Sequence, residues 1–538
     1  MKFNLIIAGI ALAIGAMTAA AQSSDDSRLQ AKMNEAVMKV YDEYLQKNPD
    51  DYETRFSRAY QHYYFGNYIN ALADVNQALD ETPQSKADLR FDELMLRARV
   101  YDARGEYQNE IADLKQALAL KPSHDVASDM LARVSLRVGE LDQAEENYRT
   151  LLRLEPTNYV AMHGLAKIEA KKGNYERAAE LVDEAARLYP TEQAVYMNRA
   201  DVLMDMDQVE PAIQNYIQAL AVGENIMPPL RELVVLSDTR YNDVMAKLAE
   251  NIERAPRVGM LYYVRAMIAI EHLHYGQAVK NLKAIVDYNL YDYHTVYYNL
   301  ALCQANLLQW DDALENINRA ITMHSSDADY YVLKARIERY RGRGDNFDAA
   351  NNALMDAATV NAEYGPMLLA KAHMLIAQRK DAEAISYLNT AVKQDDVKAE
   401  ALLTRGWVLK YRLKNTDAAK ADFQSVLASG ESDMESLRGF ALHEMSRADE
   451  ARAWAEQIIA DEPAIGGEAY YYAAALLSDM DDNDKAMQYL EKALENGYGS
   501  LFEVRVNENP YINLKLVRRH DGFNALVEKY QTCFQERR

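Results

Sequence analysis

The chain has 538 residues, of which 49% are hydrophobic and 26% are charged, and it contains only 21 glycines and 12 prolines. This length is too great for one compact core, so the composition predicts several folded domains or an elongated array. The formal net charge of -22 argues against nucleic acid or an anionic membrane surface as a partner. Two cysteines are too few for a disulfide framework or a thiolate zinc site.

The chain begins with the features of an export signal. Lys2 precedes an apolar run over residues 3–17, and small residues up to Ala21 lead into a polar SSDD stretch. We predict a signal peptide over residues 1–21 and therefore a periplasmic or secreted protein. Residues 22–50 are predicted to form a linker and an N-terminal capping helix, with Tyr41 and Tyr44 on its apolar face.

A fixed period follows. Small residues recur 34 positions apart at Ala98, Ala132, Ala166 and Ala200. The stretch GNYERAAELVDEAARLYP, residues 173–190, shows the reason, because Ala178 and Ala185 lie on one face of a helix that ends at Pro190. Gly173 ends the helix before it. Each period therefore predicts a pair of antiparallel helices that must stack on its neighbours to bury its apolar face.

This pattern resembles the tetratricopeptide repeat family. The resemblance implies an all-α, right-handed solenoid of about 12–13 antiparallel helix pairs. We expect an N-terminal array over residues 51–225, a C-terminal array over 258–497 and a C-terminal helical cap over 498–538. Residues 226–257 are expected to be a degenerate helix pair, with a drifted repeat favoured over a bend between the arrays. Glu110 replaces the usual second-helix alanine, and most of the later turns lack the glycine.

The predicted helices leave no segment for a catalytic domain, so we expect neither an enzyme nor a cofactor. DMDDNDK, residues 479–485, departs from a calcium loop at Asp484, where glycine is needed, and at Leu490, where glutamate is needed. His272 and His274 have the spacing of metal ligands but no third ligand nearby, so we expect them in a solvated turn and predict no metal site.

The resemblance implies that the first helix of each repeat lines a concave surface. The residues that it places there in the third and fourth repeats form a basic strip: Arg133, Arg137, His163, Lys167 and Lys171. A basic strip in an acidic protein would attract a carboxylate or phosphate group of a partner. The alternative that these are solubilising charges paired with nearby acids is somewhat favoured.

Aromatic residues take the same inner positions in the first repeat, at Phe56, Tyr60, Tyr63 and Tyr64. Rigid amphipathic rings suit peptide recognition, although packing between the helices is the more frequent role. The expected function is an exported scaffold that binds a protein or peptide, with an acidic one among the options, in envelope assembly or maintenance. A small-molecule or glycan receptor and a purely structural subunit of an envelope complex are the alternatives.

Overall fold

The computed structural model describes residues 27–223, 225–341, 346–429, 432–461, 467–507, 509–512, 514–531 and 534. The predicted signal peptide, residues 1–21, lies outside this part of the chain. All regular elements of the described residues are helices, which confirms the predicted all-α solenoid. None of these helices is both long and apolar enough to cross a membrane. The chain divides into two compact units, unit 1 over residues 1–212 and unit 2 over residues 213–538.

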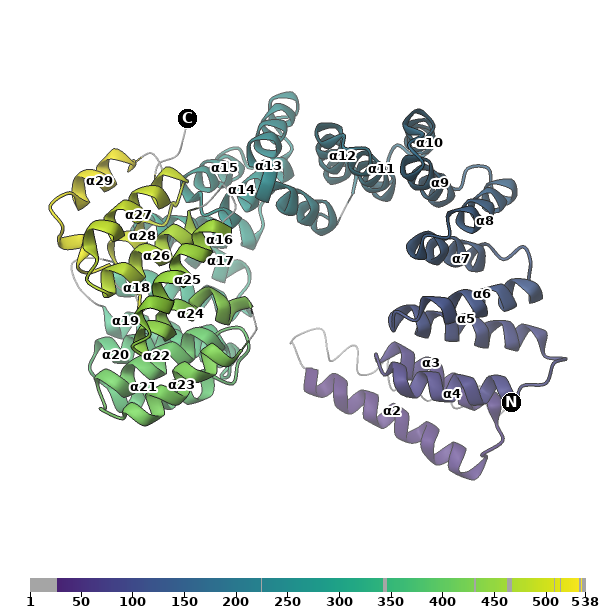
Figure 1. The fold of residues 1–538 in the computed structure, drawn as a ribbon, viewed down its shortest axis with the longest axis horizontal. Coiled ribbons are helices and arrows are strands. Elements are labelled where there is room, and N and C mark those ends of the chain that lie inside the picture. The colour runs from purple at the N-terminus through teal and green to yellow at the C-terminus, as the bar shows by residue number, and fades with distance from the viewer. Residues whose placement is uncertain are drawn as a thin grey trace. The chain divides into compact units, whose positions relative to one another are not determined.

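Unit 1 is a stack of helix pairs behind a single N-terminal helix (Figure 1). Its helices are α2 Ser27–Lys47, α3 Tyr52–Tyr64, α4 Tyr68–Glu81, α5 Ala87–Ala103, α6 Tyr107–Leu120, α7 Asp125–Val138, α8 Leu141–Leu154, α9 Tyr159–Lys171, α10 Tyr175–Leu188 and α11 Gln193–Asp205. Helix α12, Val209–Val222, runs across the division between the units. Helix α2 buries Tyr41 as expected, together with Leu45, while Val40 is exposed.

Unit 2 continues the pairs and ends in short helical segments. Its helices are α13 Met227–Arg254, α14 Gly259–Glu271, α15 Tyr275–Asp287, α16 His294–Asn306, α17 Trp310–Met323, α18 Ala328–Tyr340, α19 Phe347–Val360, α20 Gly365–Ala377, α21 Asp381–Ala391, α22 Lys398–Tyr411, α23 Thr416–Ala428, α24 Ser432–Glu444, α25 Ala448–Asp461, α26 Glu468–Asp479, α27 Asn483–Glu495, α28 Leu501–Arg505, the 3-10 turn η1 Val517–Arg519 and α29 Phe523–Lys529.

The degenerate segment is a helix pair joined without a loop. Helix α13 is interrupted at Arg240, whose backbone angles (φ -131°, ψ 35°) are not helical, so two helices meet there. The side-chain amides of Gln214 and Asn251 bond each other in both directions at 2.9 and 3.1 Å. This exchange ties the end of α12 to α13 within unit 2.

Small residues at the helix crossings set how closely the pairs stack. Ala98, Ala132 and Ala166 on the first helices, and Ala144 and Ala178 on the second, have no exposed surface. First helices also touch the first helix of the next pair, as in α3 with α5, α7 with α9 and α9 with α11, and an ion pair between Arg137 and Asp102 joins α7 to α5. The first helices of unit 1 therefore form one continuous layer.

The turn inside most of the described pairs contains a left-handed residue. Gly173, seven residues after Ala166, has φ +81°. Where the sequence lacks glycine at this position, other residues adopt the same conformation, such as Leu308 at φ 60° and Arg379 at φ 61°. The left-handed backbone angle lets the chain reverse at the end of the helix. A residue with a Cβ atom adopts this angle only with backbone strain.

We expect Arg379→Gly to raise the free energy of unfolding of unit 2 by roughly 0.5–1 kcal/mol. Relief of the left-handed strain exceeds the added entropy of the unfolded chain. Urea denaturation measures the change. Arg379→Ala removes the same side chain but keeps the strain, so a gain of equal size in that variant would contradict the explanation.

Two glycines inside helices serve a different purpose, close approach of an aromatic ring. A Cβ on Gly164 of α9 would overlap the ring of Tyr148, and a Cβ on Gly439 of α24 would overlap the ring of Trp454. Both rings are buried, with exposed fractions of 2% and 4%. In both cases the aromatic ring therefore occupies the space that a side chain on the glycine would need.

Gly439→Ala should destabilise unit 2 by roughly 1–3 kcal/mol, although alanine favours a helix by about 1 kcal/mol over glycine. The Trp454 ring has to move out of a packed core to admit the methyl group. Chemical denaturation of Gly439→Ala, of Trp454→Leu and of the double variant forms the test. If the double variant loses the full sum of the two single effects, the two residues do not compete for one space.

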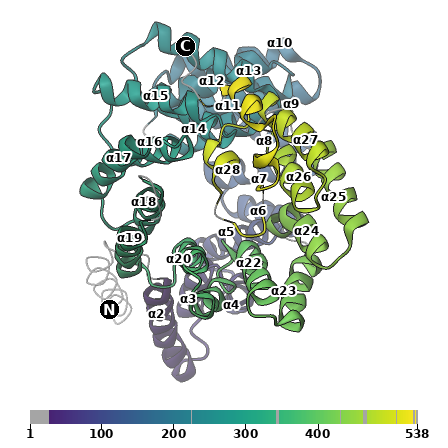
Figure 2. The same ribbon diagram turned by 90° about the vertical axis from the view of Figure 1, so that its left-hand side faces the viewer.

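The C-terminal segment of unit 2 runs into the interior of its own helical ring. Helices α14 to α27 surround α28 (Figure 2), and α28 packs on α16. The ring closes where Gly497, after α27, meets the imidazole of His274, and where the Ser500 hydroxyl donates to Asn306 Oδ1 at 3.1 Å. Phe502, 1% exposed, lies among Trp310 and Tyr340 at ring-centroid distances of 6.0 and 5.3 Å.

The predicted C-terminal cap thus has two parts with different positions. Helix α29 lies over α27, where Lys529 pairs with Glu491 at 2.6 Å and the Tyr530 hydroxyl donates to Glu495 at 2.8 Å. The described residues between 498 and 517 instead pack into the interior, and Phe502, Tyr511 and Leu514 are buried there. Arg518 donates to the carbonyls of residues 503, 504 and 506 and so fixes the end of α28.

Candidate functional site

The first-helix layer of unit 1 carries the predicted basic strip. Arg133 pairs with Asp129 on its own helix at 3.1 Å. Arg137 on α7 reaches Asp102 on α5 at 2.7 Å and lies over the Tyr107 ring at 5.0 Å. The cations are thus tied to carboxylates, one of them on the neighbouring first helix.

The same arrangement continues on the next helices. Lys167 on α9 lies 3.8 Å from Asp201 and 4.0 Å from Asp205, both on α11. Lys171 is exposed and makes no ion pair with any residue that the structure describes. The carboxylates match the cations in number, so this surface carries both signs of charge where the sequence predicted a positive strip. We call it the charge ladder: Asp102, Asp129, Arg133, Arg137, Lys167, Lys171, Asp201 and Asp205.

His163 does not contribute positive charge to the ladder. Burial, followed by the positive charge of Lys167, lowers the pKa of His163 to about 3. Its Nε2 atom is buried and has no hydrogen-bond partner among the described residues. The imidazole is neutral at ordinary pH, so the prediction that it belongs to a basic strip is corrected by its burial.

The four aromatic residues of the first repeat divide into two groups. Phe56 and Tyr63 pack against the core formed by Ala59, Val75 and Leu96. Tyr60 and Tyr64, one turn apart on α3, have exposed fractions of 46% and 75%. The exposed pair is available to a partner, whereas the packed pair holds α3 to its neighbours.

Glu110, the predicted departure from the repeat, lies buried near the ladder. Its side chain is 3% exposed, and its Oε2 atom has no hydrogen-bond partner among the described residues. Burial and the charge of Asp102 raise the pKa of Glu110 to about 7, against an opposing effect of Arg137 and Arg133. The carboxyl group is therefore partly protonated near neutral pH.

The raised pKa makes the stability of unit 1 depend on pH. The folded state favours the protonated Glu110, so its penalty is absent below pH 4.5 and grows as the pH rises to about 7. Glu110→Gln removes the penalty, and its advantage over the wild type should increase between pH 5 and pH 8 by up to about 3 kcal/mol. Denaturant titrations across this range measure it, with the exposed Glu146→Gln as the control. A constant difference at all pH values would contradict the assignment.

A serine and a histidine meet in unit 2 in a way that resembles a hydrolase site but differs in geometry. Ser237 Oγ lies 2.7 Å from His272 Nε2. Ser237 has no exposed surface, and its hydroxyl already donates to the Val234 carbonyl at 2.6 Å. Asp238 lies 3.9 Å from the same Nε2 atom, whereas a catalytic carboxylate bonds the other ring nitrogen. The arrangement cannot activate a nucleophile.

These contacts also correct the expectation for the two histidines. His272 is buried, with an exposed fraction of 6%, and burial lowers the pKa of its imidazole. His274 Nδ1 lies 2.6 Å from the Tyr241 hydroxyl, which donates to Gln277. Both belong to the packing between α13 and the following pair, and not to a solvated turn.

The acidic turn before α27 contacts basic side chains of the preceding pair. Asp482 pairs with Arg452 at 2.8 Å, and Asp479 Oδ2 lies 3.3 Å from His443 Nε2. No cluster of three or more histidine, cysteine or acidic side chains suited to a metal ion occurs in the described parts of the chain.

Stacked helix pairs with a continuous layer of first helices define an α-solenoid. Family models described as tetratricopeptide repeat match residues 130–192 and 263–328, and a second such model matches residues 94–124 and 467–496. The chain is a tetratricopeptide repeat protein.

Several solved structures are similar to this chain. A tetratricopeptide repeat protein from Parabacteroides merdae is 15% identical, with 53% of this chain and 98% of that chain covered and a TM-score of 0.29. Yeast Tom70 is 15% identical, with 89% and 99% covered and a TM-score of 0.34. YrrB, described as a TPR protein with an unusual peptide-binding site, is 16% identical, with 36% and 96% covered and a TM-score of 0.28. No curated protein matches the chain.

Proposed function

We propose that the protein is a non-enzymatic, exported scaffold that binds a protein or peptide segment on the first-helix layer of unit 1. The observation that carries this proposal is the charge ladder, a row of partly exposed ion pairs that spans four adjacent first helices, α5, α7, α9 and α11. In unit 2, α28 already lies inside the ring of helices, where Phe502 is buried. Unit 1 therefore offers the accessible layer.

The energetics of exposed ion pairs favour exchange with a partner. The Arg133 and Arg137 side chains are 61% and 52% exposed, and pairs of this kind contribute about 0–1 kcal/mol each. A partner segment that carries both carboxylate and amino groups can replace these contacts at little cost. The stacked helices hold the ladder in place, so the partner supplies most of the ordering entropy. Tyr60 and Tyr64 add rigid apolar contacts at the α3 end.

Two further features support the remaining parts of the proposal. The apolar run and small residues before Ala21 favour export, and hence a role in envelope assembly or maintenance. The failed geometry at Ser237 and His272 favours binding over catalysis.

Affinity capture from an envelope extract of the source organism tests the proposal, with residues 22–538 as bait. The variant reverses the ladder by Arg133→Glu, Arg137→Glu, Lys167→Glu and Lys171→Glu. We expect partner capture to fall roughly tenfold or more, because several contacts of about 0.5–1 kcal/mol change sign together.

The matched control changes four exposed second-helix cations of unit 1 to glutamate: Arg149, Arg153, Arg177 and Arg187. It has the same net charge as the ladder variant, so it separates position from overall charge. Capture should remain at the wild-type level. Equal capture by the wild type and the ladder variant, or no capture by the wild type, would refute binding at the ladder.

A further inference from the structure

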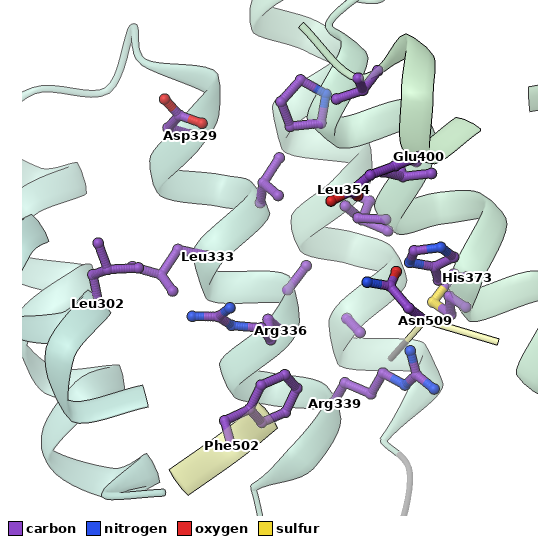
Figure 3. Close-up of a pocket in the computed structure, with 18 of the residues that line it drawn as sticks. Leu302, Asp329, Leu333, Arg336, Arg339, Leu354, His373, Glu400, Phe502 and Asn509 are labelled. Carbon is purple, nitrogen blue, oxygen red and sulfur yellow. The ribbon is translucent and has the colours of Figure 1, made fainter. Parts of the chain in front are cut away.

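A cavity of about 330 Å³ lies inside unit 2, beside the C-terminal segment (Figure 3). Helices α16, α18, α19 and α20 supply most of its wall, α22 supplies Glu400, and α28 supplies Phe502 and Glu503. Its apolar surface comes from Leu302, Leu333 and Leu354, among others. Cavities of this size with mostly apolar walls and a few polar groups are typical of small-molecule sites.

One wall of the cavity carries a cation whose hydrogen-bonding groups are unused. The Nε and Nη2 atoms of Arg336 are buried, and neither has a hydrogen-bond partner among the described residues. The guanidinium group lies 5.2 Å from the centre of the Phe502 ring, a contact that uses the face of the ring and leaves the N–H donors unpaired. A buried charged donor without an acceptor is costly, so an acceptor is expected to meet it there.

The acidic groups that line the same cavity already have partners. Asp329 accepts a hydrogen bond from the Tyr364 hydroxyl. Glu503 accepts one from the Tyr471 hydroxyl at 3.2 Å. Glu400 and the second arginine, Arg339, are also engaged in interactions. Arg336 is therefore the group of this cavity whose chemistry calls for an additional ligand.

We propose that this cavity binds a small molecule with an oxyanion, a carboxylate or a phosphate, on an apolar body. Arg336 donates from Nε and Nη2 to the oxyanion, since the guanidinium fork matches two oxygens of such a group. The leucines and Phe502 enclose the apolar part. The site lies wholly within unit 2 and is independent of the charge ladder.

Isothermal titration calorimetry on the full chain tests the site with four probes: octanoate, octyl phosphate, octan-1-ol and inorganic phosphate. Binding of octanoate or octyl phosphate, with octan-1-ol and inorganic phosphate at least tenfold weaker, is the expected result. Octanoate against octyl phosphate distinguishes the two oxyanions. Trp310, which touches Phe502, supplies a second readout by fluorescence.

Arg336→Met should weaken the preferred probe at least tenfold, and Arg336→Lys should weaken it less, because it keeps the charge but loses the fork. Arg319→Met is the matched control. Arg319 also lies over an aromatic ring in unit 2, that of Tyr297 at 4.1 Å, but it is not among the residues that line the cavity. Wild-type affinity in Arg336→Met, or no binding of either oxyanion probe to the wild type, would overturn the proposal. The result of the affinity-capture experiment, which tests the charge ladder of unit 1, does not affect this test of the cavity in unit 2.

Discussion

The close crossing of helices at buried alanines is the constraint on which the other features depend. Because Ala132, Ala166 and their equivalents have no exposed surface, adjacent first helices come near enough for side chains to bridge them. Arg137 reaches Asp102 across that distance, and Lys167 reaches Asp201. With larger residues at the crossings, the helices would separate and these pairs could not form. Packing thus determines the electrostatics of the surface.

The fold could be predicted from the sequence because its signals are local. The period of 34 residues, the glycine turns and the prolines are each read within one repeat. The turns without glycine show the limit of that reading, since Leu308 and Arg379 adopt the left-handed angle against their own preference. There the stacking of the pairs overrides the local propensity of the residue.

The candidate sites depend on contacts that no local pattern contains. The basic strip was predicted from positions on the first helices of two repeats. Asp129 lies on the same helix as Arg133, but the other balancing carboxylates, Asp102 and Asp201 among them, lie about one repeat away on neighbouring first helices. His163 looked basic because burial is not visible in a single residue letter. The position of residues 498–517 was missed for the same reason. Ser500 meets Asn306 across 194 positions, and Phe502 and Tyr511 follow no helical spacing that would point to the interior.

The closure of unit 2 changes how this part of the chain can be made. An open repeat array can form pair by pair, and it loses stability gradually when its last pair is removed. In unit 2, by contrast, residues near the end of the chain contact earlier helices: Gly497 packs against His274 at the start of α15, and Ser500 bonds Asn306 at the end of α16. During synthesis the packing of these helices is complete only after the final segment has been made. The helix pairs of unit 1 contact neighbours in sequence, so their packing can form earlier. A premature stop near the C-terminus would therefore remove packing contacts from helices that lie more than two hundred residues earlier in the chain.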